Sequence, residues 1–327
     1  MLSKILKSAS AAALIVAIGV GASSAASAKD LVATAADPVG SLKDRMCQRY
    51  LDDVRAQTGD AVTIKYIKGE ALGNAASVME QHLSGTVDIF CNELVWFADY
   101  VPDLQILGWG FTFRNEDHMA AFFDSALFSD LSKIAIKQGA RILSATPTQP
   151  RMMFTKKPVS SIDDVQGIKM RVPQLKSYLE LWTALGTRPT QVAWSEVYLG
   201  LTTGVVVAAE GPPTDAMGQN FHQAAPYITR TDHLFSTVHI SMNEATLQSL
   251  TGDQQAIVLQ AAKKATNWAR ELATNEVNTM LAKAESEGAT VSTIDKGPFQ
   301  ERSRSAVDRV EKEGLWRTGL WAEIQAL

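Results

Sequence analysis

The chain has 327 residues, 46% of them hydrophobic, and a formal net charge of −4. This composition is ordinary for a globular protein, and the sequence contains no repeats or low-complexity segments. A mildly acidic chain without a basic run argues against nucleic acid and anionic membrane surfaces as partners.

Residues 1–28 have the three parts of a secretory signal peptide. Lys4 and Lys7 supply a basic start, residues 11–20 form an apolar run, and Ala26-Ser27-Ala28 is a small-x-small cleavage site. The run is too short to span a bilayer, which takes about 20 apolar residues. We therefore expect cleavage before Lys29 and export to a bacterial periplasm.

After the signal peptide, strand and helix patterns alternate. Strands are predicted at residues 31–36, 61–66 and 86–91, with one helix beginning after Ser41 and another over residues 75–83. Ser41 is expected to cap the first helix, whose N-terminus would favour anions. The order predicts a parallel sheet with ligands beyond the carboxyl ends of its strands, where Asn92 and Glu93 lie.

A second series of strands carries two arginines. We predict an extended segment at 108–113, a strand at 140–145, and then strands at 150–155 and 167–173 around a turn at 161–164, followed by a helix at 175–185. The turn would make the strands of Arg151 and Arg171 neighbours. Two close guanidiniums repel, which favours an anion between them. A guanidinium fork also matches a carboxylate bidentately.

The last third contains a predicted helix capped by Ser195, a buried strand at 205–209, a long strand at 233–242 and a helical pattern over 246–288. A helix of about 30 residues would be about 45 Å long, the scale of a two-lobed molecule. Two lobes are also expected because the mature chain exceeds the size at which a single core keeps growing.

Signatures of catalysis and of metal binding are missing from the sequence. There is no nucleophile elbow, phosphate loop or metalloprotease motif, and His233 and His239 are too far apart on a strand to bind one metal. We therefore expect no catalytic residues, no metal and no cofactor. The sequence leaves open whether Cys47 and Cys91 form a disulfide or remain two buried thiols.

Several motifs in the second half occur in a characteristic order. They are Gly167-x-Lys169-x-Arg171-Val172-Pro173, Leu185-Gly186-x-x-Pro189-Thr190, Ser195-Glu196-Val197-Tyr198, and Thr203-Gly204-Val205-Val206 with Glu210. Leu72-Gly73 and Gly85-Thr86-Val87-Asp88 support them. With these motifs, the chain after residue 28 resembles the periplasmic substrate-binding proteins of TRAP (tripartite ATP-independent periplasmic) transporters.

The resemblance implies an α/β fold of the type II-like periplasmic binding class, with two lobes that close over an organic acid. The first lobe would comprise residues 29–148 plus about 237–275, and the second lobe residues 149–236 plus about 276–327. Crossing strands and a long helix would join them. The family's mode of action implies a monomeric binding protein that delivers its ligand to a TRAP membrane permease driven by an ion gradient.

The same resemblance assigns site residues. Arg171 would bind the ligand carboxylate bidentately, and Arg151 would occupy the family's second arginine position. Asn92 and Glu93 would line the site from the first lobe, and Trp194 would cover the ligand from the second.

Two departures from the family pattern affect the ligand. Gly211 stands where many members have an asparagine that contacts the carboxylate, a role that could pass to Thr214, Asp215 or a water, and Trp194 replaces a more usual phenylalanine. A C4-dicarboxylate is thus one candidate among sugar acids, keto acids, aromatic acids and amino-acid derivatives. The alternatives are a secreted enzyme with Glu93 or Asp215 as base, or a binding protein for an ABC importer or a sensor kinase.

Overall fold

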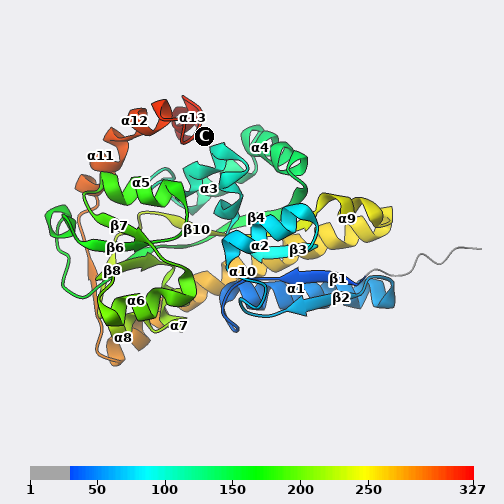
Figure 1. The fold of residues 1–327 in the computed structure, drawn as a ribbon, viewed down its shortest axis with the longest axis horizontal. Helices are drawn as coiled ribbons and strands as arrows, with labels where there is room; N and C mark the ends of the chain where they lie inside the picture. The colour runs from blue at the N-terminus through cyan, green and yellow to red at the C-terminus, as the bar shows by residue number, and fades with distance from the viewer. Residues whose placement is uncertain (1–29) are drawn as a thin grey trace, which may run out of the picture.

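The protein is built from two mixed sheets, each with helices packed on it (Figure 1). The computed structural model describes residues 30–327, so the predicted signal peptide lies outside the described residues. The first sheet has the order β2-β1-β3-β10-β4 and defines the first lobe; the second has the order β11-β9-β5-β8-β6-β7 and defines the second lobe. The prediction of a two-lobed α/β fold is confirmed.

The first sheet contains the three parallel strands that the sequence predicts. They are β1 (Leu31–Thr34), β2 (Ile64–Ile67) and β3 (Ile89–Asn92), connected by α1 (Leu42–Thr58) and α2 (Ala75–Ser84). The hydroxyl of Ser41 accepts the N–H of Asp44, so the predicted cap of α1 is confirmed. The sheet is mixed rather than parallel, because β10 (Phe235–Asn243) runs antiparallel to both β3 and β4 (Ala140–Pro150).

The second sheet does not have the predicted strand order. Its strands are β5 (Met152–Thr155), β6 (Lys169–Val172), β7 (Arg188–Gln191), β8 (Ala208–Gly211), β9 (Tyr227–Arg230) and β11 (Thr290–Thr293). The expectation that the strands of Arg151 and Arg171 are neighbours is wrong, since the fully buried β8 lies between β5 and β6. The turn η4 (Ile162–Val165) connects two strands that are not adjacent.

Three local predictions are corrected. Gly108 is the last residue of the helical η3 (Pro102–Gly108) and residues 109–113 form turns, so this segment is not extended. The predicted helix at 246–288 is divided into α9 (Glu244–Ser249) and α10 (Gly252–Ser286), because Leu250 is extended and Thr251 caps α10. Ser195 lies within η5 (Trp194–Glu196) and does not cap α6 (Val197–Thr203).

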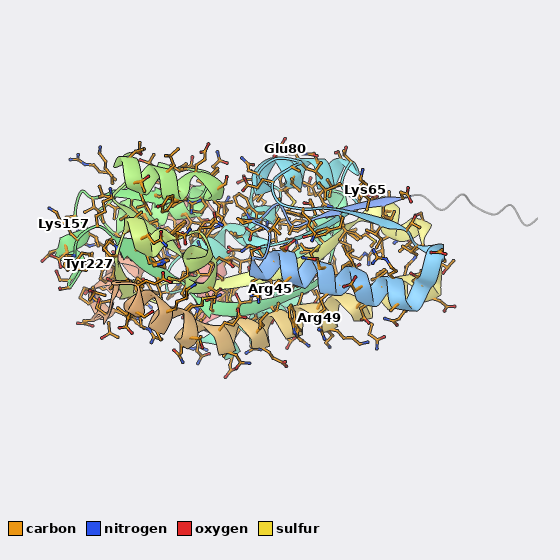
Figure 2. All side chains as sticks on the ribbon, turned by 90° about the horizontal axis from the view of Figure 1, so that it is seen from below. Arg45, Arg49, Lys65, Glu80, Lys157 and Tyr227 are labelled. Atoms are coloured by element: carbon orange, nitrogen blue, oxygen red, sulfur yellow. A yellow bond between two sulfur atoms is a disulfide. The ribbon has the colours of Figure 1, made fainter. Side chains whose placement is uncertain are left out.

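Two segments and one helix connect the lobes. The chain passes from β4 to β5 through Arg151, whose N–H donates to the carbonyl of Leu234 just before β10, at 2.8 Å. Helix α10 contacts α1, β4 and β10 in the first lobe and α7 (Pro213–Gly218) and β11 in the second. Figure 2 shows α10 running beneath both lobes, close to Arg45 of α1, which forms an ion pair with Glu276 of α10.

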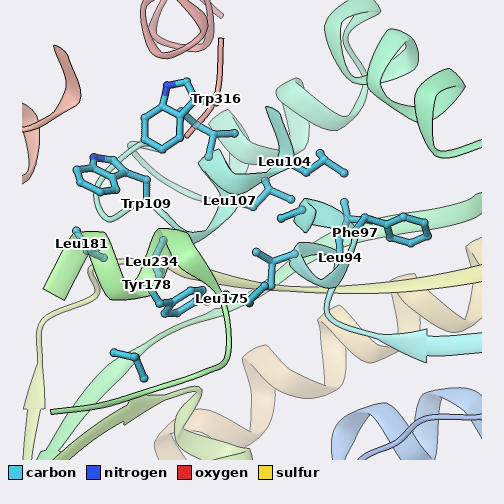
Figure 3. Packing of buried hydrophobic residues seen from close by; sticks show 14 of the residues in the cluster. Leu94, Phe97, Leu104, Leu107, Trp109, Leu175, Tyr178, Leu181, Leu234 and Trp316 are labelled. Atoms are coloured by element: carbon cyan, nitrogen blue, oxygen red, sulfur yellow. The ribbon is translucent and has the colours of Figure 1, made fainter. Parts of the chain in front are cut away.

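One buried hydrophobic cluster includes residues of both lobes. Tyr178 of α5 (Lys176–Ala184) and Leu175, the N-cap residue of that helix, lie beside Leu94 and Leu107 (Figure 3). The chain ends in α11 (Gly297–Ser305), α12 (Val307–Lys312) and α13 (Leu320–Gln325), and Trp316 between the last two packs edge-on against Trp109 at 5.4 Å. The exact lobe boundaries, including the placement of residues 276–327 in the second lobe, stay a prediction.

None of the helices within residues 30–327 combines the length and the apolar character needed to cross a membrane.

The question of the two cysteines is answered by a disulfide. Cys47 of α1 and Cys91 of β3 are bonded, with their Cα atoms 5.7 Å apart. The bond ties the first helix to the centre of the first sheet.

Two buried histidines lie in the core of the first lobe. The hydroxyl of Ser241 lies between His82 Nε2 at 2.9 Å and His239 Nε2 at 3.2 Å. Burial lowers the pKa of His82 to about 4, and burial together with His82 lowers the pKa of His239 to about 3. Both rings are therefore neutral in the folded protein at physiological pH.

We expect loss of the disulfide to lower the free energy of unfolding by about 2–4 kcal/mol, because the bond restricts the unfolded chain. The measurement is urea denaturation of the oxidised protein, the reduced protein and the Cys47→Ser/Cys91→Ser double variant. Adding reductant should leave the double variant unchanged. Equal stability of oxidised and reduced protein would contradict the structural role of the bond.

We expect the free energy of unfolding to fall as the pH is lowered from about 6.5 to 5. The unfolded chain takes up protons on both histidines near pH 6.5, whereas the folded protein does so only near their lowered pKa values, so stability is lost with falling pH at up to about 1.4 kcal/mol per histidine and pH unit. His82→Asn should lower the slope of the unfolding free energy against pH by the contribution of one histidine, because the unfolded variant takes up one proton fewer. An identical pH slope in the variant and the parent protein would rule out the proposed cause.

Candidate ligand-binding site

A cavity lies between the two lobes, at the carboxyl ends of β1 and β3. The second lobe closes it with the end of β6, the start of α5 and η5. The charged and polar wall includes Asp37, Lys43, Glu93, Arg151, Arg171 and Tyr178. The structure thus brings Asn92, Glu93, Arg151, Arg171 and Trp194, all named from the sequence, to one cavity.

Arg171 is a buried guanidinium with unused hydrogen-bonding capacity. It is 2% exposed, and its Nε and Nη2 both donate to the carbonyl of Val192, at 2.9 and 2.7 Å. Its Nη1 is buried without a hydrogen-bond partner in residues 30–327. The group lies 5.3 Å above the ring of Trp194. Burial lowers the pKa of Arg171 to about 10, which still leaves it charged at neutral pH.

Arg151 is neutralised by carboxylates of the protein itself. Its Nε and Nη2 donate to Glu210 at 2.5 and 2.8 Å, and its Nη1 donates to Glu93 at 3.0 Å. His233 also contacts Glu210, at 3.2 Å. Burial alone would raise the pKa of the fully buried Glu210, but Arg151 and His233 lower it to about 2. The anion expected between the two arginines is thus in part Glu210, a group of the protein.

Lys43, in the first turn of α1, is paired in the same way. Its Nζ lies 2.6 Å from Asp215, 3.5 Å from Asp37 and 4.0 Å from Glu93. Burial alone would lower the pKa of Lys43, but these carboxylates raise it above its usual value. Asp215 does not line the cavity itself. It lies behind Lys43 and neutralises the charge that this lysine presents to the cavity.

Asp37 is the least satisfied carboxylate of this group. It is 5% exposed, and its Oδ2 accepts no hydrogen bond from the described part of the chain. Burial raises the pKa of Asp37 to about 7, although Lys43 counteracts part of this effect.

At the N-terminus of α1, which the sequence predicts to favour anions, side chains of the protein accept two of the backbone N–H groups. The side chain of Asp44 accepts the N–H of Gly40 at 2.9 Å, and Ser41 accepts the N–H of Asp44 at 3.2 Å. Side chains of the helix itself thus occupy these donors.

Trp194 and Gly211 depend on each other. A Cβ at Gly211 would lie 2.8 Å from Cη2 of Trp194, closer than side chains normally approach. The indole therefore occupies space that a larger residue at 211 would need. Gly211 lies against Trp194, so the glycine and the tryptophan form one combined departure from the family pattern.

Asn92 has a structural role at the edge of the cavity. Its Nδ2 donates to the carbonyl of Ala35 at 2.5 Å, and its Oδ1 accepts the N–H of Glu93 at 2.7 Å. The side chain thereby fixes the segment after β1 and orients Glu93.

Polar contacts also close the mouth between the lobes. Ser195 donates to Glu70 at 2.6 Å, and Asn74 donates to Gln174 at 3.3 Å. The sequence reasoning gave none of these residues a place in the site, and it also missed Lys43, Asp37 and Tyr178. The position of Asp37 just past the first strand was the one signal, since ligands gather at such ends.

A metal site is not part of this arrangement. Within residues 30–327, no group of three or more His, Cys, Asp or Glu side chains is placed to hold a metal ion.

Comparison with known proteins gives consistent matches along the chain. The family "bacterial extracellular solute-binding protein, family 7" matches residues 33–313. A solute-binding protein of Roseobacter denitrificans is 26% identical over 261 residues, which cover 79% of this chain and 80% of the relative. The ectoine/5-hydroxyectoine-binding periplasmic protein of Ruegeria pomeroyi is 26% identical over 280 residues, which cover 83% of this chain and 81% of the relative.

Solved structures agree with the fold. The TRAP periplasmic solute-binding protein of Sulfitobacter sp. NAS-14.1 with bound β-D-galacturonate has a TM-score of 0.87 at 25% identity, covering 91% of this chain and 100% of that chain. The TRAP periplasmic solute-binding protein from Pseudomonas putida F1 with bound D-glucuronate has a TM-score of 0.84 at 26% identity. The match covers 91% of this chain and 97% of that chain. Fold and sequence together show that this chain belongs to the family 7 bacterial extracellular solute-binding proteins, the substrate-binding proteins of TRAP transporters.

Proposed function

We propose that this protein captures a small organic acid in the periplasm by binding its carboxylate to Arg171. The observation that carries the proposal is the buried Nη1 of Arg171, which borders the cavity and has no hydrogen-bond partner within residues 30–327. A buried charged donor left unpaired is costly, and a carboxylate would satisfy it.

The edge of the guanidinium that remains for a ligand follows from its existing contacts. Val192 takes the edge formed by Nε and Nη2. The ligand carboxylate would therefore bind end-on, to Nη1 and the second hydrogen of Nη2. Trp194 would lie along the same guanidinium and exclude water from the contact, which strengthens it.

Closure of the lobes would complete the site. Arg171 and Trp194 belong to the second lobe, whereas Asp37, Lys43 and Glu93 belong to the first, so a ligand between them would be contacted from both sides. We propose that the protein acts as a monomer without metal, cofactor or nucleic acid, and that its closed form delivers the acid to a TRAP permease.

A catalytic role finds no support in the geometry. Glu93 and Asp215, the two candidate bases, lie in ion pairs with Arg151 and Lys43. The relatives of known structure that bind galacturonate and glucuronate support an acid as ligand and binding as the function.

We expect Arg171→Gln to weaken binding roughly 100-fold, because the ligand carboxylate would lose its charged partner in a buried site. A thermal-shift screen of carboxylic acids identifies a ligand, and calorimetry then compares the Kd values of parent and variant. The matched control is Arg188→Gln, an exposed arginine on the neighbouring β7. If Arg171→Gln binds like the control, the carboxylate site lies elsewhere.

We expect Arg151→Gln to lower the free energy of unfolding by about 3–5 kcal/mol, because it leaves Glu210 buried without its cation. The Arg151→Gln/Glu210→Gln double variant removes both charges and should recover most of this loss. Urea denaturation of the three proteins measures the effect. Equal losses in the single and the double variant would show that the ion pair is not the cause.

A further inference from the structure

The cations around the cavity are outnumbered by carboxylates. Lys43, Arg151 and Arg171 face Asp37 and Glu93 in the cavity wall, with Asp215 and Glu210 directly behind them. Glu70 also lines the cavity. A ligand that brings negative charge therefore enters a site in which most positive charge is already paired.

The pairing leaves room for one anionic group. Arg151 makes hydrogen bonds to Glu210 and Glu93, and Lys43 makes one to Asp215. Among the cavity residues that the structure describes, Arg171 is the one cation with a buried N–H that lacks a partner. A second carboxylate on the ligand would find no unpaired cation and would approach other carboxylates instead.

The opposite wall of the cavity presents acceptors. Asp37 Oδ2 is buried and accepts no hydrogen bond in residues 30–327, and its nearest cation, Lys43, lies 3.5 Å away. A carboxylate can only accept hydrogen bonds, so it requires a donor from whatever lies next to it. Because Asp37 is buried, water would screen a second negative charge placed beside its carboxylate only weakly.

The two ends of the cavity therefore differ in the ligand groups that they can bind. Arg171 on the second lobe requires one anion, and Asp37 with Glu93 on the first lobe requires hydrogen-bond donors. Resting on the function proposed above, we infer that the ligand is a monocarboxylate whose far end carries hydroxyl or ammonium groups, and that Asp37 excludes dicarboxylates.

Acids of equal length that differ only at the far end test this inference. One series is 4-hydroxybutyrate, 4-aminobutyrate and succinate, and a longer pair is gluconate and glucarate. Calorimetry should show that the diacid of each series binds at least 100-fold more weakly than the better monoacid, since like charges in contact cost several kcal/mol. The hydroxyl and ammonium members show which donor the site prefers.

Variants assign the discrimination to a residue. Asp37→Asn removes the charge and should reduce the preference for monoacid over diacid at least tenfold. Asp130→Asn on α4 (Ala126–Lys137) is the control, because this exposed carboxylate lies away from the cavity and pairs only with Lys133 in the described chain. Circular dichroism and the melting temperature check that each variant is folded.

The outcomes separate this inference from the proposed function. If a diacid binds as tightly as its monoacid and Arg171→Gln weakens both, the carboxylate site stands and the exclusion of dicarboxylates is overturned. If Asp37→Asn leaves the preference unchanged, Asp37 is not its cause and the inference fails. If no acid of either series binds although the thermal-shift screen finds a dicarboxylate that does, the inference is overturned and the proposed function stands.

Discussion

The buried ion pair between Arg151 and Glu210 is the interaction on which the position of the site depends. Arg151 lies where the chain leaves the first sheet, and its backbone N–H binds the carbonyl of Leu234 on the returning segment. Its guanidinium holds Glu210 at the end of β8 and reaches Glu93 in the first lobe. One residue, through its backbone and its side chain, therefore connects both crossing segments, the second sheet and the opposite wall of the cavity.

This pairing gives two arginines of similar burial different roles. Arg151 has its charge compensated within the protein, so it organises the junction between the lobes. Within residues 30–327, Arg171 makes its hydrogen bonds to a neutral carbonyl, so its guanidinium has no paired carboxylate there. The residue type is the same in both positions, and the difference comes from the carboxylates that the fold places beside one of them.

Local sequence patterns predict much of the first lobe and little of the long-range pairing. Alternating strands and helices, the cap at Ser41 and the end of α2 before Gly85 follow from neighbouring residues, and the motif around Arg171 points to the family. The insertion of β8 between β5 and β6 pairs strands that are far apart in the chain. No local pattern contains that information.

The site shows the same limit. Lys43 and Asp215 are 172 residues apart in the sequence, and no pattern around either residue predicts that they form a pair. Trp194 and Gly211 look like two separate departures from the family pattern until the structure shows the indole occupying the space above the glycine. Arg171 could be recognised from its motif, whereas the residues that determine its surroundings could be identified only from the fold.

The disulfide has a consequence for recognition as well as for stability. Cys47 lies one helical turn after Lys43, and Cys91 immediately precedes Asn92 and Glu93. The covalent bond thus fastens together the two segments that bear the charged groups of the first lobe. The first-lobe half of the binding surface is therefore fixed once the disulfide has formed. Little conformational entropy is then lost there when the ligand binds.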